Sequence, residues 1–382
     1  MHPDASGGRA RTGDAATLMV CNTQSRTLPP VEAAHRVRAA LAPLGAAFRG
    51  IVLKKIDTGL RGSLGAEIDG AMDALGTTEA FVLPAIPEVG RTTVGGVQLI
   101  DGVPVHRTAF RDDPENPVRD ACVARVIEAT SCRTATAVAL DTVRRPDAVV
   151  ECVDAGRAAG ASIFVLDAET DTDLARAVAA LLVRPRPLLL VGSIGLARAL
   201  RRALPADSPP PPSSREHRAA GTGVLVVTGS AHPVARAQRV HAARCEGLRV
   251  LEVGPDADAD AVAREAGALL ARGCGVALTT PDTVVPGSER ASADVLRAVA
   301  CGALAITRTR GLVLVGGETA FRVLDGLGHP RITIEQRLGP LVVQGRLLDG
   351  EHEGLCVVTK GGSSGEEALL ARLVAVLAGR AP

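Results

Sequence analysis

Residues 53–67 read LKKIDTGLRGSLGAE, and the rest of the chain is organised around them. The apolar run Ile51–Leu53 predicts the end of a buried strand, and a helical pattern opens after the glycines. The chain contains only three lysines, Lys54, Lys55 and Lys360, among 43 Lys and Arg residues. A lysine ammonium is a compact, titratable charge and differs from the planar fork of arginine. Two lysines beside an aspartate and a glycine-rich turn therefore predict an anion site, with a charged strand end as the alternative.

Length and composition exclude several classes of protein. A chain of 382 residues favours two domains, each large enough for its own core. The formal net charge of +1 provides no strong field for a nucleic acid or an acidic partner. Aromatic residues make up 1% of the chain, so few rings are available for stacking bases. We therefore expect no nucleic-acid partner.

Cysteine spacing and hydropathy predict the compartment. None of the eight cysteines lies in a C-x-x-C pair or has zinc-site spacing. We therefore expect small buried thiols in a reducing compartment, and no metal held by a side-chain cluster. No apolar run reaches the roughly 18 residues that span a bilayer, and residues 1–16 lack the apolar segment of a secretory signal. The sequence predicts a cytoplasmic protein with no membrane partner.

Apolar runs alternate with helical patterns along the chain, which predicts an α/β fold of two domains. Each domain is expected to be a mostly parallel sheet flanked by helices, a three-layer αβα arrangement. We expect residues 1–16 to be disordered, 17–204 to form the first domain, 205–220 to be a Pro/Ser-rich linker and 221–382 to form the second domain. The strands predicted in the first domain are 17–21, 48–53, 80–83, 137–140, 163–166 and 188–191, with a hairpin over 97–105.

The second half repeats one local design three times, namely an apolar strand, a glycine-bearing turn and a helix. The strands are predicted at 223–227, 311–315 and 355–358, and the last helix is predicted to begin with a capping box over 364–367. Ligands of a parallel sheet collect beyond the carboxyl ends of its strands, where free amides and helix dipoles favour a phosphate chain. The predicted nucleotide-binding residues are Gly229, Ser230, Gly316, Gly317, Glu318, Thr319, Lys360, Gly361, Gly362 and Ser363.

The three turns also have interpretations other than a nucleotide site. Glycine also caps ordinary tight turns in any α/β domain, which is the structural alternative. No G-x-x-x-x-G-K-[ST] motif is present and no G-x-G-x-x-G follows a strand, so we expect neither a Walker-type NTPase nor a Rossmann dinucleotide site. His232, beside Pro233 in the first turn, is expected to cap or shape the loop rather than to act in catalysis. No nucleophile elbow supports a hydrolase.

The first domain carries side chains suited to a small polyhydroxy acid. Arginine forks match a carboxylate through two parallel hydrogen bonds, and an aspartate can orient a substrate hydroxyl or accept its proton. Together with a nucleotide domain, this set predicts phosphoryl transfer to an anionic sugar, normally with Mg²⁺ between the phosphates. The residues are Arg26, Lys55, Asp57, Arg61 and Arg91.

Several motifs occur together and in a fixed order. They are Ser25-Arg26, Lys54-Lys55-Ile56-Asp57 with Leu60-Arg61-Gly62, Pro84-Ala85-Ile86-Pro87 with Gly90-Arg91-Thr92, Gly192-Ser193 with Gly195-Leu196, Gly229-Ser230 with Gln238, Gly316-Gly317 with Thr319-Ala320, and Lys360 with Gly362 and Gly365. At these residues, from about Cys21 to the C-terminus, the chain resembles the four-carbon acid sugar kinases. Members of that family phosphorylate threonate, erythronate or 3-oxo-tetronate with ATP.

The resemblance implies a sugar-acid-binding N-terminal domain and an ATP-binding C-terminal domain. It implies ATP and Mg²⁺ as cofactors and the activity of a phosphotransferase with an alcohol group as acceptor. The expected partners are a small-molecule sugar acid and ATP, with a homodimer as a candidate assembly. The expected catalytic groups are Asp57, as the base that orients the hydroxyl, and Lys55. The expected substrate-binding residues are Ser25, Arg26, Lys55, Asp57, Arg61, Gly62 and Arg91.

Three features depart from the family pattern. Family members begin with a strand and an Ala-Asp-Asp-x-Thr-Gly-Ala turn that this sequence lacks, so we expect a chain truncated at its N-terminus relative to the family. The family's Asp-Ser-Thr-Leu-Arg is Asp57-Thr58-Gly59-Leu60-Arg61 here, and its Gly-Phe-Gly near the end is Ser363-Ser364-Gly365. Two hypotheses follow. The chain is an ATP-dependent kinase of a small sugar acid, or it is a catalytically impaired or truncated paralogue that binds nucleotide or sugar acid without turnover.

Overall fold

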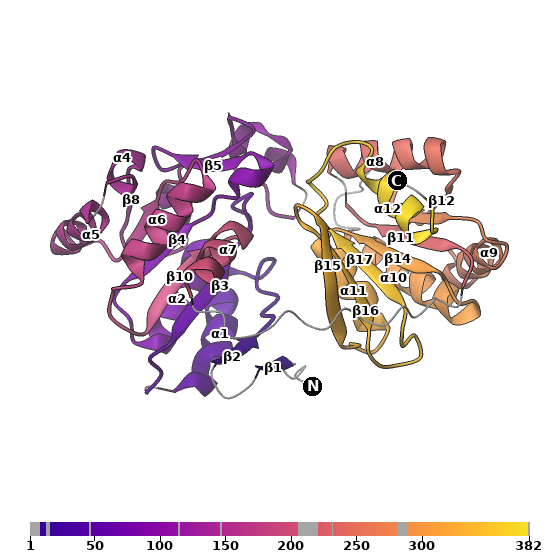
Figure 1. Ribbon diagram of the computed structural model, residues 1–382, viewed down its shortest axis with the longest axis horizontal. Coiled ribbons are helices and arrows are strands. Elements are labelled where there is room, and N and C mark those ends of the chain that lie inside the picture. Colours follow the sequence, from indigo (N-terminus) through magenta and orange to yellow (C-terminus); the bar gives the residue numbers. More distant parts are fainter. Residues whose placement is uncertain are drawn as a thin grey trace. The chain divides into compact units, whose positions relative to one another are not determined.

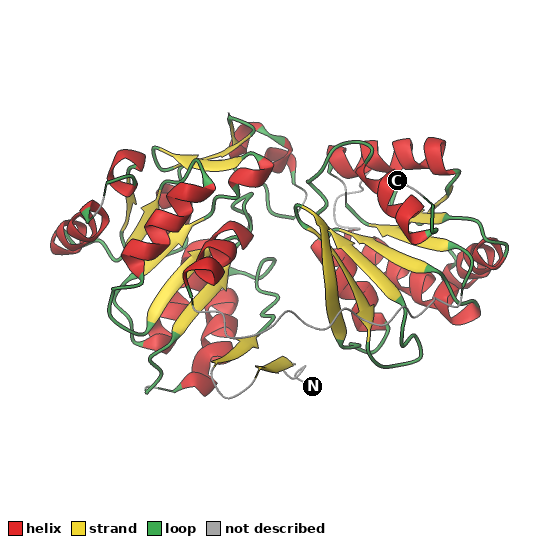
Figure 2. Cartoon of the chain, in the orientation of Figure 1, coloured by secondary structure: helices red, strands yellow, loops and turns green. Residues whose placement is uncertain are grey.

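The computed structural model describes residues 8–12, 16–45, 47–113, 115–145, 147–204, 221–230, 232–281 and 289–380. The chain divides into two compact units, Met1–Pro209 and Pro210–Pro382, each built on its own sheet (Figure 1, Figure 2). The predicted Pro/Ser-rich linker, 205–220, lies outside the described residues.

The first unit is built on a five-stranded parallel sheet in the order β3-β10-β4-β9-β8. Its strands are β3 (Ile51–Lys55), β4 (Ala80–Leu83), β8 (Ala135–Val138), β9 (Ile163–Leu166) and β10 (Leu188–Gly192). Its helices are α1 (Pro30–Leu41), α2 (Leu64–Leu75), α3 (Val123–Glu128), α4 (Leu140–Val143), α5 (Ala148–Ala158), α6 (Asp171–Leu181) and α7 (Ile194–Ala203).

Both faces of this sheet are buried, because successive side chains of each strand point to opposite faces. Phe81 and Phe164 lie on one face among residues of α5, α6 and α7, with their ring centroids 5.8 Å apart. Val82 and Val165 lie on the other face among residues of α1, α2 and α3. The two cores confirm the predicted three-layer arrangement, in which helices cover both faces of a parallel sheet (Figure 1).

A small antiparallel sheet accompanies the main sheet of the first unit. It consists of β5 (Arg91–Val94), β6 (Val97–Ile100) and β7 (Val103–Pro104). Asp101 and Gly102 join β6 to β7 with φ angles of 50° and 77°. The hairpin predicted over 97–105 is therefore confirmed, since its turn needs residues that tolerate the left-handed region. The sequence did not indicate β5, which is short and mostly polar.

The N-terminal segment forms a hairpin of its own. Strand β1 (Gly8–Thr12) pairs antiparallel with β2 (Ala16–Val20). The prediction that residues 1–16 are disordered is therefore wrong for β1, because its pairing with β2 satisfies backbone groups that a disordered chain leaves to water. Residues 1–7 and 13–15 lie outside the described residues.

The second unit is built on a seven-stranded sheet in the order β12-β13-β11-β14-β17-β16-β15. The first five strands in this order are parallel, and β16 and β15 extend the sheet in antiparallel fashion. The strands are β11 (Val224–Thr228), β12 (Arg249–Glu252), β13 (Val276–Thr279), β14 (Gly311–Val315), β15 (Ile332–Gly339), β16 (Val342–Leu347) and β17 (Cys356–Lys360). The helices are α8 (Pro233–Glu246), α9 (Ala259–Ala271), α10 (Glu289–Ile306), α11 (Gly317–Gly326) and α12 (Leu369–Leu377).

Helices cover both faces of the second sheet as well. Leu225 and Leu312 pack on one face with residues of α9, α10 and α11, whereas Val226 and Val313 pack on the other with residues of α8 and α12. Both units thus confirm the predicted α/β class, with mostly parallel sheets between helices (Figure 2).

Several element boundaries differ from the predictions by one to three residues, and two of the differences concern predicted motifs. Strand β3 runs to Lys55, two residues beyond its predicted end, so Lys54 and Lys55 both belong to the strand. Helix α12 begins at Leu369, and no side chain in the described part of the chain caps it. The predicted capping box is wrong, because Ser364 lies in the preceding loop and donates its hydroxyl to the carbonyl of Gly361 (3.2 Å).

The prediction of buried cysteines is wrong for most positions. All eight cysteines are free thiols, but only Cys356 is buried, while Cys132 and Cys245 are exposed. Cysteine is small and its sulfur is only weakly polar, so partly exposed positions tolerate it, and its spacing carries no signal of burial.

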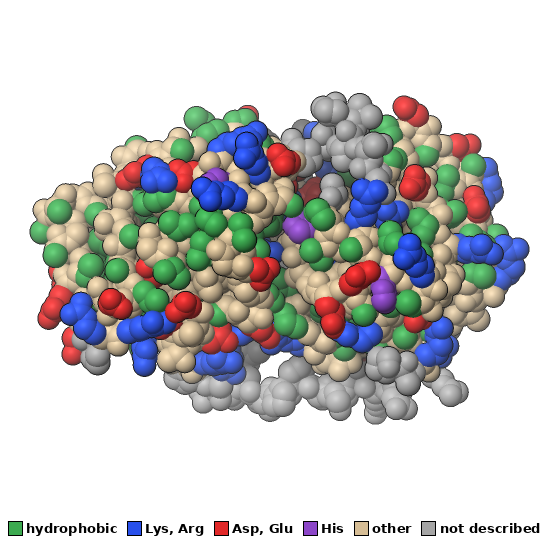
Figure 3. Space-filling model, turned by 90° about the horizontal axis from the view of Figure 1, so that it is seen from above, with side chains coloured by type: hydrophobic (Ala, Val, Ile, Leu, Met, Phe, Trp, Pro, Cys, Tyr) green, Lys and Arg blue, Asp and Glu red, His purple; other side chains and the backbone are tan. Residues whose placement is uncertain are grey.

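The surface carries charges of both signs. On the face drawn in Figure 3, acidic and basic side chains are interspersed on both units rather than gathered by sign, in keeping with the net charge of +1. No helix within the described ranges combines the length and the hydropathy of a membrane span.

Candidate functional site

The end of β3 gives its two neighbouring lysines different roles. Lys54 and Lys55 alternate along the strand, so their side chains leave opposite faces. Lys54 Nζ lies 2.6 Å from Glu67 Oε2 in the first turn of α2, and both side chains are largely buried. Lys55 is exposed and forms no ion pair with a described residue. Lys54 therefore ties β3 to α2, and the predicted anion site depends on Lys55.

Lys55 is crowded by other charges even though part of its surface reaches solvent. Its pKa is lowered from the ordinary lysine value, first by removal from water, which the attraction of Asp57 opposes, and then by repulsion from Arg26 and other nearby cations. An anion bound beside Lys55 would offset both effects, because it favours the charged ammonium.

Asp57 and Arg61 form a tight ion pair in the turn after β3. Asp57 Oδ2 accepts from Arg61 Nε (2.8 Å) and from the Gly59 amide (3.1 Å), and Oδ1 accepts from Arg61 Nη2 (3.1 Å). Arg61 Nη1 donates to Asp113 Oδ2 (2.7 Å). Burial alone would raise the pKa of Asp57, but the hydrogen bonds and charge of Arg61 lower it to about 2. Asp57 is therefore ionised at any physiological pH, and two carboxylates hold the Arg61 fork.

An aromatic ring joins the two arginines of this cluster. Arg61 Cζ lies 5.0 Å and Arg91 Cζ 5.7 Å from the ring centroid of Phe110, distances at which a cation is attracted to a ring face. Arg91 begins β5, is buried, and donates from Nη1 to the Thr58 hydroxyl. The structure thus brings the predicted Asp57, Arg61 and Arg91 together through a ring that belongs to none of the motifs. We call these three residues, with Thr58, Phe110 and Asp113, the arginine cluster.

The glycines of residues 53–67 serve close packing. A Cβ at Gly59 would lie 2.6 Å from the Phe110 ring, and one at Gly65 would lie 2.0 Å from the Ile127 carbonyl. Gly62 has φ = 96°, and its Cβ would lie 3.0 Å from the Arg26 carbonyl. Gly62, which the sequence predicted to bind substrate, therefore brings the backbone of Arg26 against the turn. Glycine alone fits such left-handed, crowded positions.

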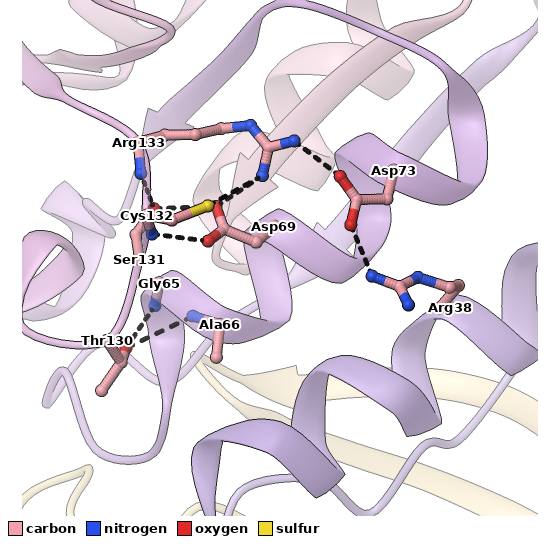
Figure 4. A network of polar contacts seen from close by, with 9 residues as sticks. All are labelled: Arg38, Gly65, Ala66, Asp69, Asp73, Thr130, Ser131, Cys132 and Arg133. Atoms are coloured by element: carbon pink, nitrogen blue, oxygen red, sulfur yellow. Dashed lines mark hydrogen bonds and ion pairs between the residues drawn. The ribbon is translucent and has the colours of Figure 1, made fainter.

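The N-terminus of α2 is capped by another part of the chain. Thr130 Oγ1 accepts from the amides of Gly65 (3.1 Å) and Ala66 (3.3 Å). Asp69, one turn further along α2, binds the same loop through three groups, namely Ser131 Oγ (2.7 Å), the Cys132 amide (2.8 Å) and Arg133 Nη1 (3.0 Å) (Figure 4). The two amides that donate to Thr130 are ones with which a helix start would otherwise bind an anion, so side chains rather than this helix end make the site.

Replacing Thr130 with valine is expected to lower the free energy of unfolding by about 1 kcal/mol, because two amides of α2 lose their acceptor. Urea denaturation measures this change, with Thr134→Val at an exposed position of the neighbouring strand region as the matched control. Equal effects of the two substitutions would contradict the capping role of Thr130.

The three glycine turns of the second unit lie on adjacent strands. In the parallel register, Thr228 of β11 pairs with Val315 of β14, and Val315 pairs with Lys360 of β17. Each of these residues ends its strand, so all three turns begin at the same level of one sheet edge. That edge is where a parallel sheet binds its ligands.

Direct contacts draw the three turns together. A Cβ at Gly362, in the third turn, would lie 2.5 Å from Ser230 Oγ in the first. The Gly229 amide donates to Thr319 Oγ1 (3.2 Å), and the Gly316 amide donates to the Lys360 carbonyl (2.8 Å). The predicted turn residues thus converge from three separate parts of the sequence.

The starts of the two helices behind these turns differ. His232 caps α8, because its Nδ1 accepts from the Val234 amide (3.2 Å), which confirms the expectation of a cap. Among the described residues, no side chain caps helix α11, and its N-cap Gly316 has φ = 100°. Apart from the neighbouring residues and the backbone of the helix itself, no described atom lies within 4 Å of a Cβ at Gly317. The amide end of α11 is therefore open to an anion. Glu318 turns instead to Arg322 (Oε1–Nε 2.8 Å).

Lys360 places a buried cation at the same edge. Its side chain is only 3% exposed, and Nζ donates to the Gly361 carbonyl (2.6 Å). Burial lowers the pKa of Lys360 to about 8. Within the described part of the chain, no carboxylate forms an ion pair with this ammonium. An ammonium buried without a counter-charge is unfavourable, so this position suits an anionic ligand.

Two family models and several known proteins match this chain. A family model described as a sugar-binding N-terminal domain matches residues 5–200, and one described as a nucleotide-binding C-terminal domain matches residues 225–370. The D-threonate kinase of Salmonella typhimurium is 31% identical over 390 residues, which cover 93% of this chain and 87% of that protein. The chain belongs to the four-carbon acid sugar kinase family. The resemblance seen at the sequence motifs and the expected class of enzyme, a phosphotransferase, are confirmed.

Other relatives in the four-carbon acid sugar kinase family act on different acids. The D-erythronate kinase of Heliobacterium modesticaldum is 29% identical, with 92% of this chain and 85% of that protein covered. The 3-oxo-tetronate kinase of Methylobacterium radiotolerans is 30% identical, with 95% and 90% covered. Because these identities are nearly equal, overall likeness does not select one acid.

Solved structures share the fold of this family member. A crystal structure from Salmonella typhimurium LT2 superposes with a TM-score of 0.69 over 92% of this chain and 87% of that chain, at 21% identity. One from Haemophilus influenzae gives a TM-score of 0.58 over 91% and 87%, at 20% identity. At such identities the likeness shows the fold alone.

Three groups of the arginine cluster were missed by sequence reasoning. Thr58, Phe110 and Asp113 hold Arg91 and Arg61, although none was predicted as a site residue. Asp113 lies 52 positions from Arg61, so spacing could not connect them. The available signal was the run of acidic residues and prolines in the sequence at 112–117.

Proposed function

We propose that the chain is an ATP-dependent kinase that phosphorylates a hydroxyl of a four-carbon sugar acid such as threonate, erythronate or 3-oxo-tetronate. The observation that carries this proposal is Lys360, a buried ammonium with no carboxylate partner among the described residues, at the edge where three glycine turns converge. A polyphosphate supplies the missing negative charge, and glycines let backbone amides approach it. We assign nucleotide binding to 221–382 and sugar-acid binding to 17–204.

The nucleotide fits the open groups of the second unit. Gly316 and Gly317 present the uncapped start of α11, and the backbone of Gly362 runs beside Ser230. Lys360 supplies the cation. Within the described ranges, no three His, Cys, Asp or Glu side chains are placed to hold a metal ion. A Mg²⁺ ion would therefore take most of its ligands from phosphates and water, as this ion commonly does.

The sugar acid fits the cluster of the first unit. Arg61 is held by Asp57 and Asp113, so we assign it to positioning. Lys55, exposed at the end of β3, is the cation assigned to the substrate carboxylate, together with Arg91. Arg26 adds positive charge beside Lys55, with Ser25 buried next to it. Together, these lysine and arginine side chains can form charge-assisted hydrogen bonds with the carboxylate of a small acid.

Asp57 is assigned to orienting the substrate hydroxyl. Its pKa of about 2 makes it a weak proton acceptor at neutral pH, because an efficient base titrates near the working pH. From the described residues, Oδ1 accepts one hydrogen bond, that of Arg61, which leaves acceptor capacity for a hydroxyl. In phosphoryl transfer, positioning and charge stabilisation do most of the work, so an ionised, fixed carboxylate serves without being a strong base.

The experiment that tests the kinase proposal is ADP release from Mg-ATP with D- and L-threonate, D- and L-erythronate and their 3-oxo forms. Turnover with one acid and not with its epimers is expected and would identify the substrate. ATP that raises the melting temperature without any turnover would instead support the alternative, binding without catalysis. No turnover and no thermal shift would contradict both.

Nucleotide binding is expected to weaken as the pH rises through about 8. Burial lowers the pKa of Lys360 to about 8, so the unliganded protein loses this charge above that pH, whereas bound phosphates favour the charged form. Calorimetric titration with ADP from pH 7.5 to 9.5, above the last phosphate pKa of about 6, should show weaker binding and proton uptake. Lys360→Arg keeps its charge and should bind equally at each pH. A wild-type affinity that does not change with pH would contradict the assignment.

Three further expectations accompany the kinase proposal. Mg²⁺ dependence is tested by adding EDTA to the ADP-release assay, which should abolish turnover. A homodimer is tested by light scattering on the purified chain. A cytoplasmic location is expected because free thiols, of which the chain has eight, persist in reducing compartments. Cell fractionation tests it.

A further inference from the structure

Gln238 of α8 lies at the centre of the loop that follows β17. Its side chain is fully buried. Nε2 lies within hydrogen-bond distance of three consecutive carbonyl oxygens, those of Ser364 (3.1 Å), Gly365 (2.9 Å) and Glu366 (2.8 Å). An amide nitrogen carries two protons, so these three acceptors share two donors. The chain at 364–366 therefore curls around this one side chain.

The backbone of this loop is shaped to fit Gln238. Gly365 has φ = 89°, and a Cβ there would lie 2.2 Å from Leu369 Cδ2 and 3.3 Å from Gln238 Nε2. Only glycine adopts this conformation without strain in so narrow a space. The glycine thus lets the chain reverse around the amide before α12 begins.

A path of hydrogen bonds leads from Gln238 to the Lys360 ammonium. Gln238 Nε2 binds the Ser364 carbonyl, and Ser364 Oγ donates to the Gly361 carbonyl (3.2 Å). Lys360 Nζ donates to that same carbonyl (2.6 Å). The position of the ammonium is therefore set by a loop whose far end is held by Gln238.

The two ends of the Gln238 amide differ in their contacts. Gln238 Oε1 is buried and accepts no hydrogen bond from a described residue. A buried acceptor without a partner is unfavourable for the folded state. The side-chain hydrogen bonds of Gln238 are therefore those of Nε2, the atom that holds the loop carbonyls, which indicates a role in placing that loop.

We propose that Gln238 is a positioning residue of the nucleotide site, which ties the helix behind the first glycine turn to the third turn and thereby holds Lys360 and Gly362 in place. This inference rests on the proposed binding of nucleotide by the second unit. Gln238 acts through the loop 361–366, and no direct contact with the ligand is needed.

The test uses Gln238→Met, which keeps the length of the side chain and removes its hydrogen bonds. The KM for ATP is expected to rise about tenfold, the equivalent of one ordinary hydrogen bond, while the KM for the sugar acid stays within about twofold. Gln336→Met, an exposed position on β15, is the matched control and should leave both constants unchanged. A lower melting temperature with an unchanged KM for ATP would overturn the proposal.

Gln238→Glu provides a second test, the pH dependence of the KM for ATP, which should not change if Gln238 serves only to stabilise the fold. Its carboxylate would face three carbonyls when ionised, whereas the protonated acid donates one hydrogen bond. The ratio of variant to wild-type KM for ATP is therefore expected to fall as the pH is lowered from 8 to 5.5. A ratio that stays constant would count against the proposal even if Gln238→Met fails to fold. If the wild-type protein shows no ATP-dependent thermal shift, the proposed function itself is wrong.

Discussion

Replacing Lys360 with methionine is expected to raise the KM for ATP by roughly 100-fold, since hydrogen bonds to charged groups contribute about 1.5–3 kcal/mol. The substitution removes the buried cation at the edge where the three glycine turns meet. Methionine fills the same volume with an apolar, unbranched side chain, so the fold should be kept. The loss should therefore appear in nucleotide binding and not in folding.

The substitution of Lys360 should also change the melting temperature in a direction that few losses of a binding residue share. Burial lowers the pKa of Lys360 to about 8, so at neutral pH the folded protein holds an ammonium that would be better solvated in the unfolded chain. The melting temperature of the unliganded Lys360→Met protein should equal or exceed that of the wild type, while the thermal shift caused by ATP should disappear. A nucleotide affinity equal to that of the wild type would contradict the assignment of Lys360.

Lys55→Met is the matched control, because it removes the exposed lysine at the end of β3. It is expected to raise the KM for the sugar acid about tenfold or more, as expected for a lost charge-assisted contact. The thermal shift caused by ATP should stay unchanged. If Lys360→Met weakens the binding of ATP alone and Lys55→Met weakens the binding of the sugar acid alone, the two lysines serve different substrates.

Replacing Asp57 with asparagine is expected to lower kcat/KM for the sugar acid by roughly 100-fold or more. Asparagine keeps the size of the side chain but loses the charge that orients the hydroxyl and pairs with Arg61. Of its carboxylate partners among the described residues, Arg61 would then keep Asp113. ATP binding should not change, so steady-state kinetics in both substrates locates the defect in the first unit.

Asp120→Asn is the control for this substitution. Asp120 has a pKa of about 2, like Asp57, but its hydrogen bonds come from Arg125 and neighbouring amides. Neutralising it removes a carboxylate that is equally acidic and outside the arginine cluster, so kcat/KM should stay within about twofold. Full activity of the Asp57→Asn protein would contradict the role of Asp57.

The pH dependence distinguishes an orienting carboxylate from a general base. Because the pKa of Asp57 is lowered, from 3.8 to about 2, its ionised form stabilises the folded state fully above pH 3.8. That contribution is lost only as the pH falls through about 2. Asp57 should therefore cause no acid limb in kcat/KM between pH 5 and 8. A limb in this range that vanishes in Asp57→Asn would identify Asp57 as a base with a raised pKa.

Much of the fold could be predicted from local pattern. Strands β4, β9 and β14 lie at the predicted positions, because each is an apolar run that must be buried on both faces of a parallel sheet. The turns after β11, β14 and β17 could be recognised from glycines that follow such runs. Local pattern failed at Ser364–Glu367, where a good capping sequence lies in a loop instead of starting a helix.

Residue types near one another in sequence also predicted part of the site. The Asp57–Arg61 pair lies four positions apart within one turn, so its contact follows from chain geometry. The same reasoning could not separate Lys54 from Lys55, since burial of Lys54 against Glu67 depends on how α2 packs on β3.

The sequence by itself determined the class of fold, the family and the chemical character of the two binding regions, because these depend on composition, periodicity and short motifs. Only the tertiary structure decided which groups meet. Asp113 reaches Arg61 from 52 positions away, and Gln238 reaches Ser364 from 126 positions away. Such contacts depend on strand order and helix packing, which are set by the burial of apolar surface over the whole domain and not by the residues that finally touch.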